Sequence, residues 1–231
     1  MFELVKTFQF EAAHENTRGL HGHSYQAEVH VAGEADPVHA WVLDYGEITY
    51  RFKPLFNQLD HYLLNGVEGM DDVSASGVRT WIHGRLQPEI PLLKDVHVNI
   101  IGDCAFVPRT REAWPAFRLP ARTAFTFEAA HFLPTLAETH KCRRMHGHSF
   151  HVEIAAGDSG NVEAIAKAIY DTLDHTCLNT LAGLENATSE MLAGWIWQWM
   201  EKHGTSPRAV VVAETCTARC MHFGPSTGNR R

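Results

Sequence analysis

An internal repeat constrains this chain more than any other feature of its sequence. Residues 8–25 read FQFEAAHENTRGLHGHSY, and residues 125–150 hold the same landmarks, FTFEAAH followed after a longer interval by HGHSF. Self-similarity of this kind indicates that one supersecondary unit occurs twice. At 231 residues the chain is long enough for two such units. We therefore expect two tandem domains, 1–112 and 118–231.

Both halves show the same order of predicted elements. Hydrophobic periodicity predicts strands and helices in the first half, in chain order, at 2–10, 24–32, 44–59, 74–86, 95–101 and within 105–120. The second half repeats this order at 122–130, 149–156, 161–173, 189–202, 208–214 and 218–223. Asp44 is a plausible cap of the first helix, and Pro54 inside it predicts a kink or a break.

The fold class that follows is α+β, with the order ββααββ in each half. Each half is expected to form a four-stranded antiparallel sheet with both helices on one face. The other face and the edges of such a sheet have to be covered, and assembly through sheets is the natural way to cover them.

The composition excludes several classes of partner. A net charge of −7 argues against a general nucleic-acid or anionic-membrane surface. No stretch approaches the roughly 18 apolar residues of a membrane span. An odd count of 5 cysteines, without an apolar signal segment after Met1, predicts free thiols in the cytoplasm.

Histidine is the residue type in excess, with 16 in the chain. Eight of them fall in the repeated motifs: His14, His21, His23, His61, His131, His146, His148 and His175. Two histidines at i and i+2 on a strand point to the same face, and a third from the neighbouring strand brings three nitrogens to one point. Three neutral imidazoles suit zinc and leave one tetrahedral position open, as in catalytic sites.

The predicted zinc ligands are His131, His146 and His148 in the second half and His14, His21 and His23 in the first. A single His-Gly-His is more often a packing feature than a ligand pair, but the pattern occurs twice. Cys142, four residues before His146, is then a candidate acid/base or nucleophile near the metal.

Basic residues flank this cysteine. Lys141, Arg143 and Arg144 make the stretch electropositive, which should favour the thiolate of Cys142 and suit it as a base. The same basic run can equally contact a phosphate group or remain a solvated loop.

Taken together, the motifs resemble a known family. His131, Cys142-x-x-x-His146-Gly-His148, Asp174-His175, Glu190 in Asn-Ala-Thr-Ser-Glu and Glu214 in Glu-Thr-Cys resemble the 6-pyruvoyltetrahydropterin synthase family. The three-residue gap between cysteine and His-Gly-His is most similar to the bacterial 6-carboxytetrahydropterin synthases of the queuosine pathway. The resemblance covers nearly the whole chain as two copies.

This resemblance implies a fold, a metal and a substrate. It implies the tunnelling fold (T-fold), whose sheets close into β-barrels by homo-oligomerisation, together with Zn²⁺ and a small pterin triphosphate substrate. The implied activity is a zinc-dependent lyase that converts 7,8-dihydroneopterin triphosphate to 6-carboxy-5,6,7,8-tetrahydropterin, triphosphate and acetaldehyde. A 6-pyruvoyltetrahydropterin synthase, which eliminates triphosphate and keeps the side-chain carbons, is the alternative enzyme. A non-catalytic zinc- or pterin-binding module is the alternative outside enzymes.

The resemblance also implies residue roles. Cys142 would be the base, and Asp174 would orient His175 for proton exchange on the opposite side of the substrate side chain. Glu214 would accept two N–H groups from the 2-amino-4-oxo edge of the pterin. Glu190 would contact the same ring, or else is simply a first-turn glutamate favoured by the helix dipole.

The first half departs from the family pattern. It keeps the three histidines and the pair Asp60-His61, but no cysteine lies between His14 and His21. Gly102 stands where the second half has Glu214, and Ser76-Gly77 stands where it has Ser189-Glu190. We expect the first copy to be degenerate as an independent catalyst.

The two halves are complementary in what they lack. The interval between His-Gly-His and Asp-His is much shorter in the second half than in the first. A composite site is therefore a hypothesis, in which Cys142 and Glu214 act with Asp60 and His61.

The remaining cysteines are less informative. Cys104 and Cys177 are expected to be small buried residues. Cys216 and Cys220 can be a redox or metal pair, but reduced strand and turn residues are the expected interpretation, since no partner pair accompanies them.

Overall fold

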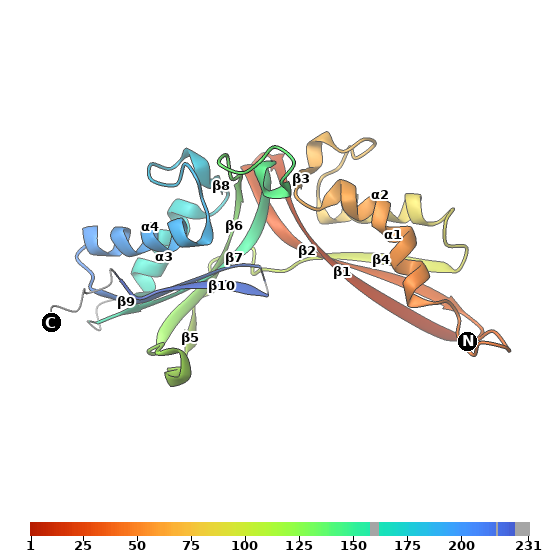
Figure 1. Cartoon of the computed structure of the whole chain (residues 1–231), viewed down its shortest axis with the longest axis horizontal. Coiled ribbons are helices and arrows are strands. Elements are labelled where there is room, and N and C mark those ends of the chain that lie inside the picture. The colour runs from red at the N-terminus through yellow and green to blue at the C-terminus, as the bar shows by residue number, and fades with distance from the viewer. Residues whose placement is uncertain (158–161, 216, 225–231) are drawn as a thin grey trace.

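The computed structural model describes residues 1–157, 162–215 and 217–224, and it contains two sheets that each carry two helices on one face (Figure 1). In the first sheet the strand order is β3-β1-β2-β4. The bounds of its strands are β1 Phe2–Asn16, β2 Gly19–Gly33, β3 Tyr62–Leu63 and β4 Leu93–Ile100. The helices α1 (Tyr45–Leu59) and α2 (Ala75–Leu86) cover it.

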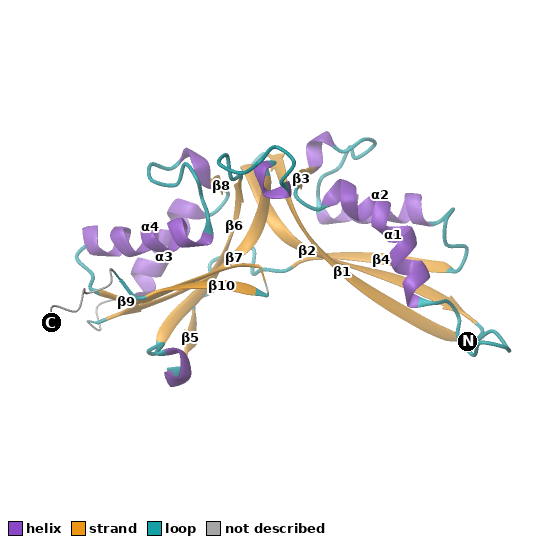
Figure 2. Cartoon of the chain, in the orientation of Figure 1, coloured by secondary structure: helices purple, strands orange, loops and turns teal. Residues whose placement is uncertain are grey.

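The second sheet has six strands, in the order β10-β9-β7-β6-β5, and β8 pairs with β6. Their bounds are β5 Arg109–Arg111, β6 Arg122–His131, β7 His146–Ala156, β8 Thr176–Cys177, β9 Pro207–Thr215 and β10 Ala218–His222. The helices α3 (Val162–Leu173) and α4 (Ser189–Lys202) cover this sheet. Residue 161, the predicted first residue of α3, lies outside the described residues. The predicted mixture of α and β elements is confirmed, and Figure 2 shows the strands and helices in separate layers.

Local signals account for the helix starts. The side chains of Asp44, Ser74 and Thr188 each accept a backbone N–H in the first turn of α1, α2 and α4. The expected break at Pro54 does not occur, because α1 is continuous from Tyr45 to Leu59. Proline removes one N–H from the helix, and the residue four positions earlier, Tyr50, is 70% exposed, so water can replace the lost donor.

Each sheet has its own hydrophobic core on its helical face. In the first half, aromatic and aliphatic side chains such as Phe10, Tyr25 and Phe52 are buried between the sheet and α1 and α2. In the second half, Phe127 and Phe150 occupy the positions that correspond to Phe10 and Tyr25, with stacked rings whose centroids are 5.1 Å apart. The repeat in the sequence is therefore also a repeat in the packing.

The last strand of the first half belongs to the second sheet, which corrects the expectation of four antiparallel strands in the first half. Residues 109–111 form β5, which pairs antiparallel with Arg122–Ala124 at the edge of β6. The strands β3 and β8 are also not antiparallel, because each runs parallel to the first strand of its half over two residues. Three long antiparallel strands remain in the first sheet.

The hairpins β1–β2 and β6–β7 cross where the two halves meet, near the top of Figure 1. A Cβ atom on Gly22 would overlap the backbone of Gly147, and a Cβ atom on Gly147 would overlap that of Gly22. Two residues further on, the backbone N–H of Ser24 donates to Ser149 Oγ and that of Ser149 donates to Ser24 Oγ, both at 3.2 Å. Glycine at the crossing lets the two backbones touch.

Among the described residues, no helix has the length and apolar character needed to cross a membrane.

Candidate metal centres and their composite surroundings

Three buried histidines meet at the crossing end of the second sheet, and we call them the second cluster: His131, His146 and His148. His131 ends β6 and pairs in register with His146 at the start of β7. Two of the rings are fixed through Nδ1 by backbone carbonyls, His131 by Ala187 at 2.8 Å and His146 by Arg144 at 2.7 Å. The Nε2 atoms of all three rings lack a hydrogen-bond partner although they are buried.

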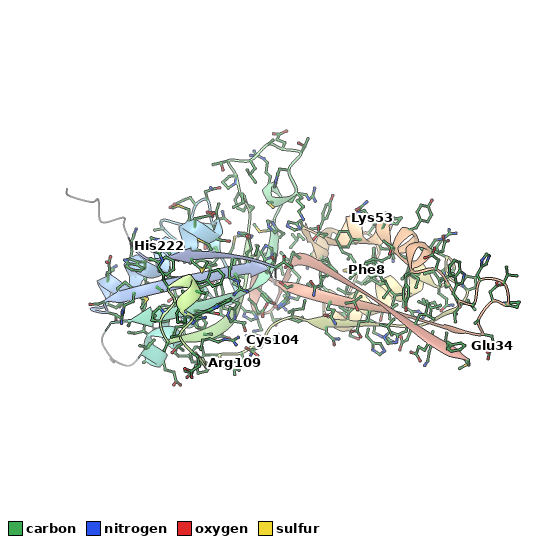
Figure 3. All side chains as sticks on the ribbon, turned by 60° about the horizontal axis from the view of Figure 1, so that its bottom comes forward. Phe8, Glu34, Lys53, Cys104, Arg109 and His222 are labelled. Carbon is green, nitrogen blue, oxygen red and sulfur yellow. The ribbon has the colours of Figure 1, made fainter. Side chains whose placement is uncertain are left out.

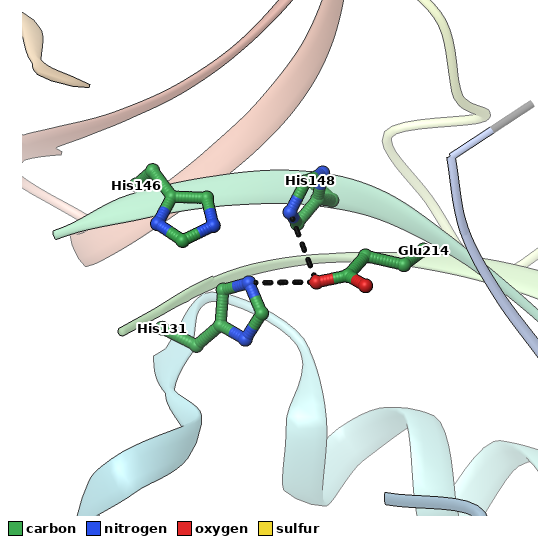
Figure 4. Close-up of side chains that lie close together, drawn as sticks. All are labelled: His131, His146, His148 and Glu214. Atoms are coloured by element: carbon green, nitrogen blue, oxygen red, sulfur yellow. Dashed lines mark ion pairs between the residues drawn. The ribbon is translucent and has the colours of Figure 1, made fainter. Parts of the chain in front are cut away.

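The carboxylate of Glu214 faces these nitrogens (Figure 4). Its Oε1 lies 3.0 Å from His131 Nε2 and 3.3 Å from His148 Nε2. Because Nδ1 of His131 bonds a carbonyl and therefore carries the proton, a neutral His131 presents a lone pair to the carboxylate. Buried acceptors that face one another are stabilised by a nearby cation, so the three histidine nitrogens fit a zinc ion.

Burial and close contacts shift the pKa values of the residues in the second cluster. Burial lowers the pKa of His131 and His146, and for His146 the neighbouring rings lower it further. Burial also opposes protonation of His148, but the hydrogen bond to Glu11 and the adjacent carboxylate of Glu214 outweigh it and raise the pKa of His148 to about 9. The same contacts hold the pKa of Glu214 far below its ordinary value, although burial opposes this.

Asp60 and His61 come from the first half and lie against the second cluster. The rings of His61 and His146 stack with centroids 4.4 Å apart. His61 Nδ1 donates to Asp60 Oδ1 at 2.8 Å, and the backbone N–H of His61 donates to the carbonyl of Glu11 at 2.6 Å. Burial opposes ionisation of Asp60, but the bond from His61 and the one from the Glu11 N–H hold the pKa of Asp60 below its usual value.

Cys142 lies on the same side, so ligand atoms of Cys142, His61 and His146 all lie within 4.8 Å of one another. The loop that carries the thiol is fastened to the first half. Lys141 Nζ is 3.2 Å from Asp60 Oδ2, and Arg144 Nε donates to the carbonyl of His61 at 3.0 Å. The composite arrangement thus lies within one chain.

The electropositive surroundings expected for Cys142 are outweighed. Partial burial raises the pKa of its thiol, Glu214 raises it further, and Lys141 only partly opposes this. Arg143 is turned away, since its guanidinium donates to the carbonyls of Pro134 and Leu136. Lys141 and Arg144 do favour the thiolate of Cys142, as predicted, but burial and the nearby carboxylates outweigh them, so the pKa of the thiol is raised.

The first cluster, His14, His21 and His23, is built in the same way. Nδ1 of His14 and of His21 contact the carbonyls of Val73 and Gly19 at 2.8 and 2.9 Å, so their Nε2 lone pairs face each other at 2.8 Å. Burial lowers the pKa of His21 to about 3, which keeps the ring neutral at ordinary pH. These three residues also form a group suited to a metal ion.

Asp174 and His175 lie beside the first cluster and not beside Cys142. The ring of His175 is 4.1 Å from that of His21, and its Nδ1 donates to Asp174 Oδ2 at 2.7 Å. His61 and His175 share an unusual left-handed backbone, with φ of 60° and 54°. Such conformations are costly outside glycine and cluster at functional sites. Each Asp-His pair therefore lies beside the cluster of the other half.

Cys104 is not the buried residue that the sequence predicts, because it is exposed and lies where the two halves meet (Figure 3). Its sulfur belongs to a group with His23 and Glu128, all within 4.8 Å. Partial burial and the carboxylates of Glu128 and Asp174 raise the pKa of Cys104 to about 11. The other described cysteines, Cys142, Cys177 and Cys220, are free thiols and partly buried, whereas Cys216 lies outside the described residues.

The pterin-binding candidates take different positions. Glu214 is held by Ser189, whose hydroxyl donates to Oε2 at 3.1 Å. Glu190 is exposed in the first turn of α4 and lines a surface cavity with Leu181 and Trp195, outside the metal groups.

The strand register changes the assignment of Gly102. Val98 pairs with Ala27 and Val212 pairs with Val152, and these pairs are equivalent in the repeat. Counting two residues on, Ile100 corresponds to Glu214, so Gly102 is not the replaced position. The prediction that Gly102 replaces Glu214 is therefore corrected by the pairing of each strand with its neighbour.

Glu11 and Glu128 are the residues that sequence reasoning missed. Both belong to the repeated Phe-Glu-Ala-Ala-His segment, and each lies against a histidine of the other half. His148 Nδ1 lies 2.7 Å from Glu11 Oε2, and His23 Nδ1 lies 2.6 Å from Glu128 Oε2. Their identity in both copies was the available signal, but period-two alternation assigns them only to the strand face opposite the apolar core.

Comparison with known proteins agrees with the two-copy organisation. The family model described as 6-pyruvoyl tetrahydropterin synthase matches residues 3–102 and 121–225. The 6-carboxy-5,6,7,8-tetrahydropterin synthase of Synechocystis sp. is 39% identical over 118 residues, which cover 44% of this chain and 90% of that protein. Nearly the whole length of that relative thus matches less than half of this chain.

Two further relatives have other descriptions. The dihydroneopterin monophosphate aldolase of Pyrococcus furiosus is 31% identical over 92 residues, 38% of this chain and 77% of that protein. The solved structure of Caenorhabditis elegans 6-pyruvoyl tetrahydropterin synthase matches with a TM-score of 0.40 at 20% identity, over 42% of this chain and 87% of that one.

Proposed function

Because this chain belongs to the 6-pyruvoyl tetrahydropterin synthase family, we propose that its second cluster is the active site of a zinc-dependent 6-carboxy-5,6,7,8-tetrahydropterin synthase of the queuosine pathway. Its substrate would be 7,8-dihydroneopterin triphosphate. Members of the family are tetrahydropterin synthases, which are lyases, and the Synechocystis relative supports the carboxy product in particular.

The observation that carries the proposal is the meeting of residues from both halves. The thiol of Cys142 and the ring of His61 approach His146 from different segments, with ligand atoms within 4.8 Å of one another. A metal-binding nitrogen set, a thiol and an imidazole held by a carboxylate are the groups that proton transfer at a carbon side chain requires. The retained thiol also argues against a purely structural zinc or pterin module.

Each residue at the second cluster would have its own role in the reaction. Cys142 would take a proton from the substrate side chain, and His61, oriented by Asp60, would exchange a proton on the other side. Glu214 would accept N–H groups from the pterin edge, next to the cluster. Zinc held by His131, His146 and His148 would supply Lewis acidity toward the side-chain hydroxyls of the substrate.

The remaining assignments follow the same proposal. Residues 1–112 and 118–231 would be two T-fold units that close barrels by homo-oligomerisation in the cytoplasm. The first cluster would hold a second metal, with Asp174 and His175 beside it. Glu190, which is exposed, would at most contact the outer part of the substrate.

Product analysis tests this proposal. Purified protein loaded with zinc is incubated with dihydroneopterin triphosphate, and the products are identified by mass, for the unchanged protein and for Cys142→Ala. We expect 6-carboxytetrahydropterin with acetaldehyde and triphosphate, and loss of this product in Cys142→Ala. Release of triphosphate with retention of all side-chain carbons would instead assign a pyruvoyl synthase, and no turnover would favour a binding module.

A further inference from the structure

We propose that Glu11 and Glu128 are positioning residues for the metal clusters, each acting on the cluster of the other half. This inference rests on the metal-binding part of the proposed function. It adds that neither half completes its own metal site, because one ring in each cluster is oriented by a carboxylate across the crossing.

In the second cluster this carboxylate comes from β1. Glu11 Oε2 lies 2.7 Å from Nδ1 of His148, and both side chains are largely buried, with 12% and 2% exposed. Because Nδ1–H donates to the carboxylate, the Nε2 atom of His148 is aimed at the cluster centre. Glu11 contributes nothing to the Nδ1 atoms of His131 and His146, which bond carbonyls of their own half.

In the first cluster the carboxylate comes from β6. Glu128 Oε2 lies 2.6 Å from Nδ1 of His23, with 1% and 5% of the side chains exposed. His14 and His21 again contact carbonyls of their own half. In each cluster, two rings are therefore fixed locally and the third is fixed by the other half.

The two glutamates are themselves held by one bridge. Ser24 Oγ donates to Glu11 Oε2 at 2.6 Å, and Ser149 Oγ donates to Glu128 Oε2 at 2.7 Å. The two serines also exchange backbone N–H bonds with each other's hydroxyls. A continuous chain of hydrogen bonds thus runs from His148 to His23 through the crossing.

The physical reason for an effect on metal affinity is general. A carboxylate behind a ligating imidazole fixes its tautomer and orientation and raises its basicity, and loss of such a partner costs about 10–100-fold in metal affinity. A purely structural glutamate would lower stability without selecting one cluster. The prediction is a crossed pattern, in which Glu11 affects only the second cluster and Glu128 only the first.

The experiment measures metal affinity one cluster at a time in the full chain. His21→Ala removes the first cluster and leaves the second, and His146→Ala does the opposite. In each background the Co²⁺ and Zn²⁺ dissociation constants are measured by competition with a chelator, with and without Glu11→Gln or Glu128→Gln. The Co²⁺ absorption spectrum reports the coordination geometry.

We expect Glu11→Gln to weaken metal binding about 10–100-fold in the His21→Ala background, and Glu128→Gln to do so in the His146→Ala background. Each is expected to have little effect in the other background. Glutamine keeps the side-chain shape, and far-UV circular dichroism checks folding. Ser24→Ala removes the hydroxyl that donates to Glu11 and accepts from the Ser149 backbone N–H, and it is a milder second variant with a smaller expected loss at the second cluster.

Glu153→Gln is the matched control, since Glu153 is a carboxylate on β7 that is 4% exposed and bonds Arg122 and His151 instead of a cluster histidine. It should leave both affinities unchanged. Equal effects of the two glutamates in both backgrounds, effects on the same half, or no metal binding by the unchanged chain would overturn the inference. Turnover without the crossed pattern would overturn only this inference, whereas the crossed pattern without turnover would overturn only the proposed activity.

Discussion

At the scale of single residues, neighbouring charges shift the pKa of the Cys142 thiol in opposite directions. Lys141 and Arg144 favour its ionised form, whereas partial burial and the carboxylates of Glu214 and Asp60 oppose it, and the net effect is a raised pKa. A base with a raised pKa is a stronger acceptor of protons but is ionised in fewer molecules at neutral pH.

Alkylation of Cys142 should therefore depend on pH in a defined direction. In the metal-free protein its rate of reaction with iodoacetamide should rise through a midpoint above the value of about 8.5 of an ordinary thiol. Glu214→Gln should lower this midpoint, because it removes a negative charge, and Lys141→Gln should raise it. Mass spectrometry of the Cys142 peptide gives the rates, and a midpoint below that of a free thiol would contradict the prediction.

The two Asp-His pairs allow a second prediction at this scale. Asp60 orients the imidazole that faces Cys142, whereas Asp174 orients the one that faces the first cluster. Asp60→Asn should lower kcat by about 10²–10⁴-fold, the usual contribution of a positioned acid or base. Asp174→Asn should lower it by a smaller factor. Steady-state kinetics with dihydroneopterin triphosphate decide, and unchanged activity in Asp60→Asn with lost activity in Asp174→Asn would rule out the composite site.

At the scale of elements, the helices could be predicted from local sequence signals, whereas the pairing of one short strand could not. The prediction of a helix at 189–202 is confirmed, with Thr188 as its cap, because capping residues and apolar spacing are local signals. The pairing of β5 with β6 was not foreseeable, since three exposed residues, Arg109–Arg111, carry no pattern that selects one sheet over the other. Its pairing with the start of the next strand, at residues 122–124, decided it.

The crossing of the two hairpins predicts the effect of a methyl group. Gly22→Ala would place a Cβ against the Gly147 backbone, and the hairpins would have to separate. We expect the free energy of unfolding to fall by about 1–3 kcal/mol, as in other overpacked sites. Gly84→Ala is the control, because Gly84 lies in α2 with nothing within 4 Å of a Cβ and should gain about 0.5–1 kcal/mol. Urea unfolding followed by circular dichroism measures both, and equal stabilities of the two variants would contradict the close approach.

At the scale of the whole molecule, each half contributes side chains to the surroundings of the other half's histidine cluster. Each half supplies a histidine cluster and sends an Asp-His pair and a glutamate to the cluster of the other half. Within the part of the chain that the structure describes, the edge strands β4 and β10 each pair with one neighbouring strand only. Unpaired strand edges favour association with further strands.

We therefore expect a homo-oligomer in solution. Three chains would form two stacked barrels if each barrel is closed by three equivalent halves, whereas alternating halves in larger barrels would give dimers or tetramers. Light scattering coupled to gel filtration measures the molar mass and chooses between these assemblies. A monomer at micromolar concentration would contradict barrel closure.

The sequence by itself determined the two repeated units and the kind of site that they carry. A repeated motif fixes two copies of one fold, and three histidines at strand spacing with a nearby cysteine specify a metal site, because side-chain type and period are local properties. Only the tertiary structure decided which residues share a site. Asp60 and His61 meet Cys142, Ile100 takes the position of Glu214, and Glu11 and Glu128 cross between halves. These relations depend on strand register and on two glycines that let the hairpins touch, and no local pattern encodes how separate segments approach each other.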